Sequence, residues 1–132
     1  MELMKIKEAS GKAIKSALDV SRLCSDIALA DREVFVVLHL NARNKVIEKE
    51  IVSMGILDSC LIHPREVFKK AIIKSAHSII TVHNHPGGSL TPSIEDLDAW
   101  KKLIDAGDLL GISVLDHIIV TSQGYYSQKE EV

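Results

Sequence analysis

Short apolar runs that alternate with amphipathic segments constrain the fold of this chain most strongly. Residues 33–40 (EVFVVLHL), 78–82 (SIITV) and 112–121 (ISVLDHIIVT) are rich in β-branched and apolar side chains, which is typical of buried strands. A second strand at 45–53 follows the first run after the polar turn 41–44, so these two strands are predicted to form a hairpin.

Three segments between these runs carry apolar residues at helical spacing. The first is 16–30 and the second is 64–75, which begins with a proline suited to a first helical position. We expect Thr91 to cap the third helix, with Pro92 as its first residue and Gly107 or Gly111 at its end. Four residues are expected to form the buried stripe of this helix: Ile94, Leu97, Leu103 and Ile104.

The order helix, two strands, helix, strand, helix, strand predicts an α/β fold. We expect one three-layer domain over residues 1–132, with a mixed β-sheet flanked by helices and a flexible arm at 1–15. A chain of 132 residues can bury a sufficient core without a structural metal. Any bound metal is therefore expected to serve chemistry.

Charge and hydropathy exclude several functional classes. The formal net charge is −2, whereas domains that mainly neutralise nucleic-acid phosphates carry a basic excess. No apolar run is long enough to span a membrane, and the N-terminus lacks the apolar core of a signal peptide. Cys24 and Cys60 form no CxxC pair and are interpreted as reduced thiols. We therefore expect a cytoplasmic protein.

A polar cluster follows the second predicted buried strand. His83 and His85 are two residues apart on an extended chain, so their imidazoles project to one side and can share one ion. A Gly- and Pro-rich loop then turns the chain into a helix, where Ser93 and Asp96 are three residues apart and share a face. Asp96 can thus supply a third ligand for a divalent cation such as zinc, leaving one position open for water.

The string HNHPGGSLTPSIED resembles the JAMM (MPN+) motif, and the surrounding sequence closely resembles the bacterial RadC family. The resemblance is carried by REVFVVLHLNARNKVI, GILDSCLIHPREVFKKAI, SIITVHNHPGGSLTPSIED and GISVLDHIIVT, which span residues 32–121. It implies a cytidine-deaminase-like JAB (MPN) fold with one zinc per chain, held by His83, His85 and Asp96. It further implies a metallopeptidase or isopeptidase with Glu33 as general base and Ser93 as a stabiliser of the oxyanion.

Other polar residues have a simpler interpretation. Glu66 competes with Glu33 for the role of base, but an acidic residue in a first helical turn needs no further explanation. Asp116 and His117 are neighbours in a strand and therefore point to opposite faces. One of them could be a hydrogen-bond partner of a metal-bound imidazole, and the alternative is that both make structural hydrogen bonds. His39 and His63 are expected to be structural. Three lysines are expected to form a solvated helix face: Lys69, Lys70 and Lys74.

Two departures from the family pattern bear on function. Gly87 stands where the family more often has serine, but this residue is not a predicted ligand. Full-length RadC proteins also usually carry an N-terminal helical region, and its absence before residue 16 puts a DNA-binding role in doubt. A DNA-repair-associated metal-dependent nuclease and a non-catalytic binding module remain as alternatives to a hydrolase of peptide or protein substrates. A strand edge would permit a homodimer.

Overall fold

The computed structural model describes residues 13–55 and 62–130 of the chain. Its elements in chain order are α2 (Ala17–Leu23), α3 (Ser25–Ala28), β1 (Glu33–Leu40), β2 (Val46–Gly55), α4 (Pro64–Ile73), β3 (Ser78–Asn84), α5 (Ile94–Leu110), β4 (Ser113–Thr121) and β5 (Gly124–Ser127). The strands form one sheet in the order β2-β1-β3-β4-β5. Only the β3–β4 pair in this sheet is parallel.

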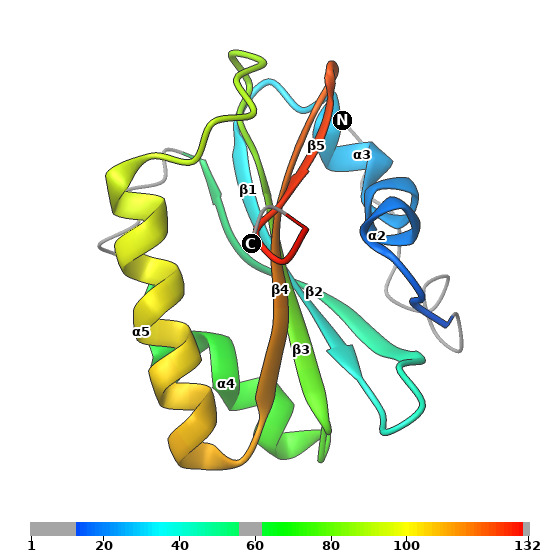
Figure 1. Cartoon of the computed structure of the whole chain (residues 1–132), viewed down its shortest axis with the longest axis vertical. Coiled ribbons are helices and arrows are strands. Elements are labelled where there is room, and N and C mark those ends of the chain that lie inside the picture. Colours follow the sequence, from blue (N-terminus) through cyan, green and yellow to red (C-terminus); the bar gives the residue numbers. More distant parts are fainter. Residues whose placement is uncertain (1–12, 56–61, 131–132) are drawn as a thin grey trace.

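Helices cover both faces of the sheet (Figure 1): α4 and α5 lie on one face, and α2 and α3 on the other. The prediction of a three-layer α/β fold with a mixed sheet is therefore confirmed. The hairpin is also confirmed, since β1 and β2 are antiparallel neighbours joined by a turn at 41–45.

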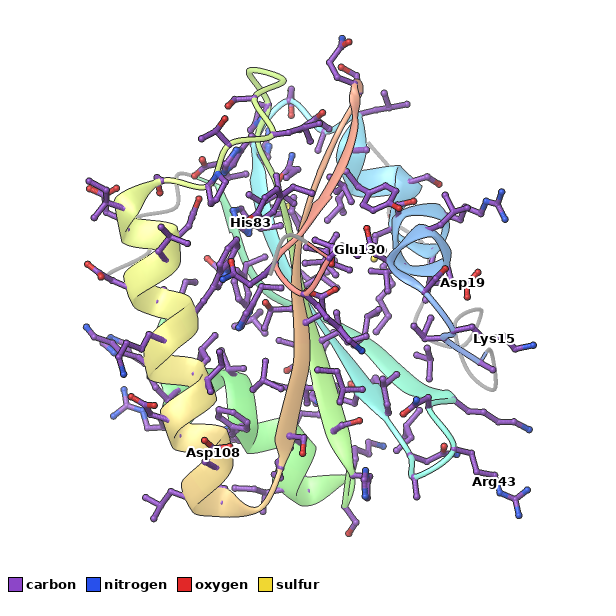
Figure 2. The ribbon with its side chains drawn as sticks, in the orientation of Figure 1. Lys15, Asp19, Arg43, His83, Asp108 and Glu130 are labelled. Carbon is purple, nitrogen blue, oxygen red and sulfur yellow. The ribbon has the colours of Figure 1, made fainter. Side chains whose placement is uncertain are left out.

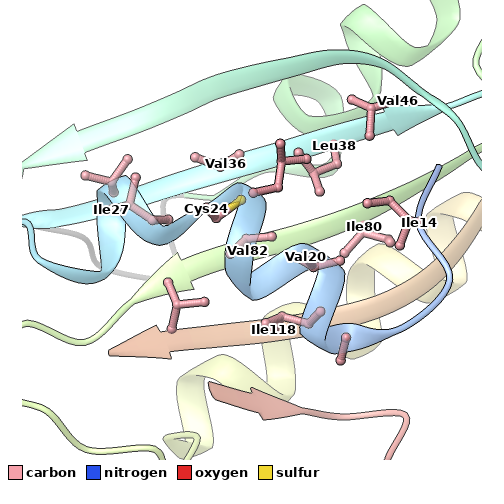
Figure 3. Packing of buried hydrophobic residues seen from close by; sticks show 14 of the residues in the cluster. Ile14, Val20, Cys24, Ile27, Val36, Leu38, Val46, Ile80, Val82 and Ile118 are labelled. Carbon is pink, nitrogen blue, oxygen red and sulfur yellow. The ribbon is translucent and has the colours of Figure 1, made fainter. Parts of the chain in front are cut away.

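Side-chain alternation along the strands divides the core into two clusters. Val34, Val36 and Leu38 of β1 pack under α2 and α3 together with Val20 and Ile27 (Figure 3). The residues of β1 between them point to the other face. There the second cluster joins β1 and β3 to α4 and α5, through Phe35, Val37, Phe68, Ile79 and Leu103. The candidate site lies at the edge of this second cluster.

The segment 16–30, predicted as one helix, is two short helices that meet at Cys24. A buried lysine explains the break. Lys49 of β2 is 1 % exposed, and its ammonium donates to the Leu23 carbonyl and to both carboxylate oxygens of Asp26. The Leu23 carbonyl, at the last residue of α2, therefore accepts a hydrogen bond from the Lys49 ammonium.

Part of the arm predicted at 1–15 is tied to the domain. Ala13 forms a β-bridge with Lys45, and the Ile14 N–H donates to the Asn44 carbonyl at 2.8 Å. The Ile14 side chain is buried in the first cluster. The rest of the predicted arm and Cys60 lie outside the described residues.

Helix α5 differs from its prediction in both its start and its buried face. Its N-cap is Ser93, so Thr91 and Pro92 precede the helix. Ile94, Leu97 and Ile104 are exposed. The face against the sheet carries Asp96, Trp100, Leu103 and Gly107. The apolar pattern misled the prediction because a carboxylate occupies one of the inward positions.

Gly107 allows α5 to lie close to the sheet. A Cβ atom at this position would be 2.5 Å from the Ile112 carbonyl oxygen, which is closer than real Cβ contacts. The helix continues through Gly107 and ends at Gly111, the second of the two predicted ends, which is in a left-handed conformation (φ 74°). Within the described residues, no helix is both long and apolar enough to cross a membrane.

Candidate metal centre

The two histidines of the predicted site come from the end of β3. His83 is the penultimate residue of the strand, and His85 directly follows the strand. Alternation places both imidazoles on the α5 side of the sheet, as predicted, and their Nε2 atoms are 3.1 Å apart. Figure 2 shows His83 close to the first turn of α5.

Helix α5 brings the third residue to this pair through a capping box. The Ser93 Oγ accepts a hydrogen bond from the Asp96 N–H at 3.0 Å, and Asp96 Oδ2 accepts one from the Ser93 N–H at 2.9 Å. This reciprocal pair fixes both the helix start and the direction of the Asp96 carboxylate. The carboxylate, in the first turn of the helix, is also favoured by the helix dipole.

The three side chains converge closely enough to share one ion. Asp96 Oδ1 is 3.4 Å from His83 Nε2, and Asp96 Oδ2 is 3.3 Å from His85 Nε2. One donor atom from each residue lies within 4.8 Å of the others. Ligands at zinc's usual 2.0–2.1 Å in tetrahedral geometry would be about 3.3 Å apart. A His-His-Asp donor set at this spacing fits a divalent cation.

Hydrogen bonding orients His85 for this role. Its Nδ1 lies 2.9 Å from the Ser89 carbonyl oxygen, which can only accept a hydrogen bond. Nδ1 therefore carries the proton, and the Nε2 lone pair is directed toward His83 and Asp96 when the ring is neutral. A backbone carbonyl behind a ligating imidazole is a common support in metal sites. The loop residue Ser89 thus sets the tautomer of a candidate ligand.

Charge at the centre follows from the same contacts. The hydrogen bond with Asp96 raises the pKa of His85 above its ordinary value. Burial by itself would raise the pKa of the Asp96 carboxyl, but hydrogen bonds with His83 and His85 outweigh burial and hold this pKa well below its usual range. Asp96 is therefore an anion at neutral pH, as a metal ligand must be.

Aromatic rings pack around His83. The Phe35 and Trp100 rings each lie 6.2 Å from its ring centroid, and Trp100 stacks on His117 at 5.0 Å. His117 is also hydrogen-bonded to Thr81 on the neighbouring strand. Burial lowers the pKa of His117 to about 3, so this ring is neutral at ordinary pH. These contacts show a structural role for His117.

A cavity of about 360 Å³ opens at the centre, a size that suits a small-molecule or peptide side-chain site. The three predicted ligands line it together with Glu33, Ser93 and a third acidic side chain, Glu95. The rest of the lining is an apolar wall of Phe35, Ile62, Ala99 and Trp100. The structure thus brings all five predicted site residues to one cavity. Glu33 is half-buried at the first position of β1, and its charge acts on His85.

The other candidates lie elsewhere. Glu66 is exposed in the first turn of α4 and lines a different hollow with Glu50 and Lys70. Asp116 accepts hydrogen bonds from the Ser127 hydroxyl and the Lys129 N–H. These contacts assign Glu66 and Asp116 no part in the centre.

The remaining residues predicted to be structural lie outside the cavity. His39 is buried and hydrogen-bonded to Glu50, while His63 occupies the N-cap position of α4. The predicted lysine face is only partly solvated. Lys69 is exposed, but Lys70 lies 2.9 Å and Lys74 3.7 Å from the buried Glu48 carboxylate.

Sequence reasoning missed Asn84, which links the centre to the start of β1. Its Oδ1 accepts the Val34 N–H at 2.7 Å, and its Nδ2 donates to the Arg32 carbonyl at 2.9 Å. Its position between two same-sided histidines was a usable signal, because alternation turns a middle residue to the other face. The apolar wall of Phe35, Ile62 and Trp100 gave no such signal.

Comparison with known proteins agrees with this geometry. A family model described as a RadC-like JAB domain matches residues 14–132. A UPF0758 protein of Rubrobacter xylanophilus is 51 % identical over 118 residues, covering 89 % of this chain and 52 % of that protein. A UPF0758 protein of Finegoldia magna is 50 % identical over 107 residues, covering 81 % and 48 % respectively. This chain thus spans about half the length of the curated relatives that it matches.

Proposed function

Because the chain belongs to the RadC-like JAB domain family, we propose that it is a zinc-dependent amide hydrolase of the JAMM type. Its substrate is a peptide or an isopeptide-linked protein. The observation that carries this proposal is the convergence of His83, His85 and Asp96 in a cavity that Glu33 and Ser93 also line. Three protein ligands and an accessible opening are the arrangement of catalytic zinc sites, whereas structural sites are closed by four ligands.

The bound cation would polarise the amide carbonyl and lower the pKa of water toward neutrality. The protein's own residues supply the proton transfers. Glu33 takes a proton from the attacking water and returns it to the leaving amine. Its position at the first residue of β1 places it on the cavity wall and outside the His-His-Asp set.

Ser93 is suited to stabilise the oxyanion that forms on the carbonyl oxygen. Its Oγ accepts the Asp96 N–H, and that bond leaves the hydroxyl proton available to donate. The residue is exposed on the cavity rim and its backbone is fixed by the capping box. A preorganised donor of this kind is worth about 10²-fold or more in turnover.

The walls of the cavity favour an amide over a phosphodiester. The acidic side chains Glu33 and Glu95 flank the centre, and they repel the phosphates of a nucleic acid. Phe35, Ile62 and Trp100 offer instead an apolar surface for an aliphatic substrate side chain. The net charge of −2 points in the same direction.

A cleavage screen tests the proposal. The chain is prepared without chelator, loaded with one equivalent of zinc, and incubated with a peptide library and with single- and double-stranded DNA. We expect zinc-dependent cleavage of peptide bonds and none of DNA. The matched control is the double variant His83→Ala/Asp96→Ala, which should cleave neither.

Each other outcome rejects the proposal in a different way. Zinc-dependent cleavage of DNA alone would make the chain a metal-dependent nuclease. Stoichiometric zinc without cleavage of either substrate would make it a binding module. Peptide cleavage that survives in the double variant would move the activity away from this centre.

A further inference from the structure

The backbone pairing of β1 with β3 ends at the site. Its last pair is Phe35 with His83, so the next residue of each strand, Val34 and Asn84, would be the following pair. At this point the Asn84 side chain replaces the missing backbone bonds. It accepts the Val34 N–H at 2.7 Å and donates to the Arg32 carbonyl at 2.9 Å.

A carboxamide is suited to this substitution because it carries an acceptor and a donor, as a peptide group does. Asn84 is fully buried, and its own backbone pairs with β4 opposite Val120. Its side chain is therefore held rigidly from the central part of the sheet. Val34 is buried as well, so the bond that its N–H donates is not readily exchanged for a bond to water, whereas the Arg32 carbonyl belongs to an exposed residue.

The two bonded backbone groups flank Glu33 in sequence. One belongs to the residue before it and the other to the residue after it. On the opposite edge of β1, Glu33 pairs with Gly55 of β2. From the β3 side, the Asn84 amide gives this part of β1 two hydrogen bonds, one on each side of Glu33.

We propose that Asn84 is a positioning residue that fixes the Glu33 backbone relative to His83 and His85. The inference rests on the proposed function, because it assumes that Glu33 is the base. The tripeptide His83-Asn84-His85 then serves both parts of the site. The two histidines would hold the cation, and Asn84 holds the start of β1, which carries Glu33. The position of the Glu33 backbone relative to the two histidines is then set by the peptide chain of β3 and by the two hydrogen bonds of the Asn84 side chain.

Hydrogen exchange tests the positioning without any need for activity. In Asn84→Ala the Val34 amide should lose at least about tenfold of its exchange protection, while amides in the middle of β1 keep theirs. Zinc stoichiometry should stay at one per chain, because Asn84 is not a ligand. The matched control is Val82→Ala, which truncates a fully buried side chain of the same strand and should leave Val34 protected.

A second variant guards against general loss of structure. Asn84→Leu is close to Asn in size, so it removes both hydrogen bonds without the cavity that Asn84→Ala leaves. It should lose Val34 protection as Asn84→Ala does. Unchanged Val34 protection in both variants would overturn the inference, whatever the activity of the protein.

A double-mutant cycle tests the link to catalysis. Asn84→Ala should lower kcat by about 10- to 100-fold with little change in KM, since small displacements of a catalytic group are costly. In the Glu33→Gln background the same change should cost less than about threefold, because no base remains to be positioned. Equal losses in both backgrounds would show a purely structural role and overturn the inference. Absence of peptide cleavage by the unaltered zinc-loaded chain would instead reject the proposed function, and the exchange result would still stand.

Discussion

Ser93 and Asp96 cap each other: the Ser93 hydroxyl accepts the Asp96 N–H at 3.0 Å, and the Asp96 carboxylate accepts the Ser93 N–H at 2.9 Å. The same carboxylate lies 3.4 Å from His83 Nε2 and 3.3 Å from His85 Nε2. The carboxylate proposed as third ligand is therefore oriented by the start of α5. Any change that shifts this helix start will also move the carboxylate.

The ligand assignment predicts the metal content of variants. The unaltered chain should bind one zinc, and His83→Ala/Asp96→Ala should lose stoichiometric zinc because two of three donors are gone. Elemental analysis after gel filtration measures this. The matched control is His77→Ala, which removes an exposed imidazole at a distance from the cavity and should retain one zinc. One zinc per chain in the double variant would contradict the assignment.

The fold should not depend on the metal. Two apolar clusters hold α2, α3, α4 and α5 to the sheet without any contribution from the ligands. The apo protein should therefore unfold in one cooperative thermal transition. Zinc at about 100 times its Kd should raise the free energy of unfolding by about 2.7 kcal/mol. Loss of all cooperative unfolding after chelation would show that the metal is structural.

Glu33 and Glu66 are separated by one pair of conservative variants. Glu33→Gln keeps the shape of the side chain and removes its basicity, so it should retain zinc and lower kcat by about 10²–10⁴-fold. Glu66→Gln alters an exposed side chain of α4 and should leave kcat nearly unchanged. The measurement is turnover of a peptide found in the cleavage screen. If only Glu66→Gln is inactive, the base has been assigned to the wrong glutamate. If Glu33→Gln loses its zinc, Glu33 is a ligand.

His117 should make the fold sensitive to acid. Burial lowers its pKa from 6.5 to about 3, so between these values the unfolded chain binds the additional proton. Stability contributed by the neutral ring is complete above pH 6.5 and is lost as pH falls toward 3. The slope from one such group approaches about 1.4 kcal/mol per pH unit.

Urea unfolding of chelated protein at several pH values between 4 and 7 checks this sign, with His117→Gln compared against the unaltered chain. The variant should show a smaller loss of stability on acidification. His77→Gln, which replaces an exposed imidazole, is the control and should keep the original slope. An unchanged slope in His117→Gln would show that this ring is not the buried neutral group responsible.

The sequence predicted those features that depend on local pattern. The apolar strands and the hairpin could be predicted because burial on both faces leaves a continuous apolar run, as in 33–40. The convergence of His83, His85 and Asp96 could be predicted because strand alternation and helical spacing are fixed periods. The place of Glu33 beside them came from family resemblance, since nothing local marks a lone glutamate.

What could not be predicted depends on contacts between distant segments. The break at Cys24 follows from the buried Lys49 of β2, whose ammonium donates to the Leu23 carbonyl and to the Asp26 carboxylate. The inward face of α5 carries Asp96, and its apolar residues Ile94 and Ile104 are exposed. A prediction based on hydrophobic spacing assigns the wrong residues to the core when a polar side chain such as Asp96 occupies a position that faces the sheet.

The bonds between Asn84 and the start of β1 join positions 50 residues apart, so the order of folding is constrained as well. Glu33 and the two histidines cannot meet until β1 and β3 have paired, and long-range pairing of this kind is slow. Zinc should therefore bind after the rate-limiting step. Stopped-flow refolding should proceed at the same rate with and without zinc, while unfolding should be slower with zinc. Newly made chains would then reach the folded state regardless of how much metal is present, and acquire it afterwards.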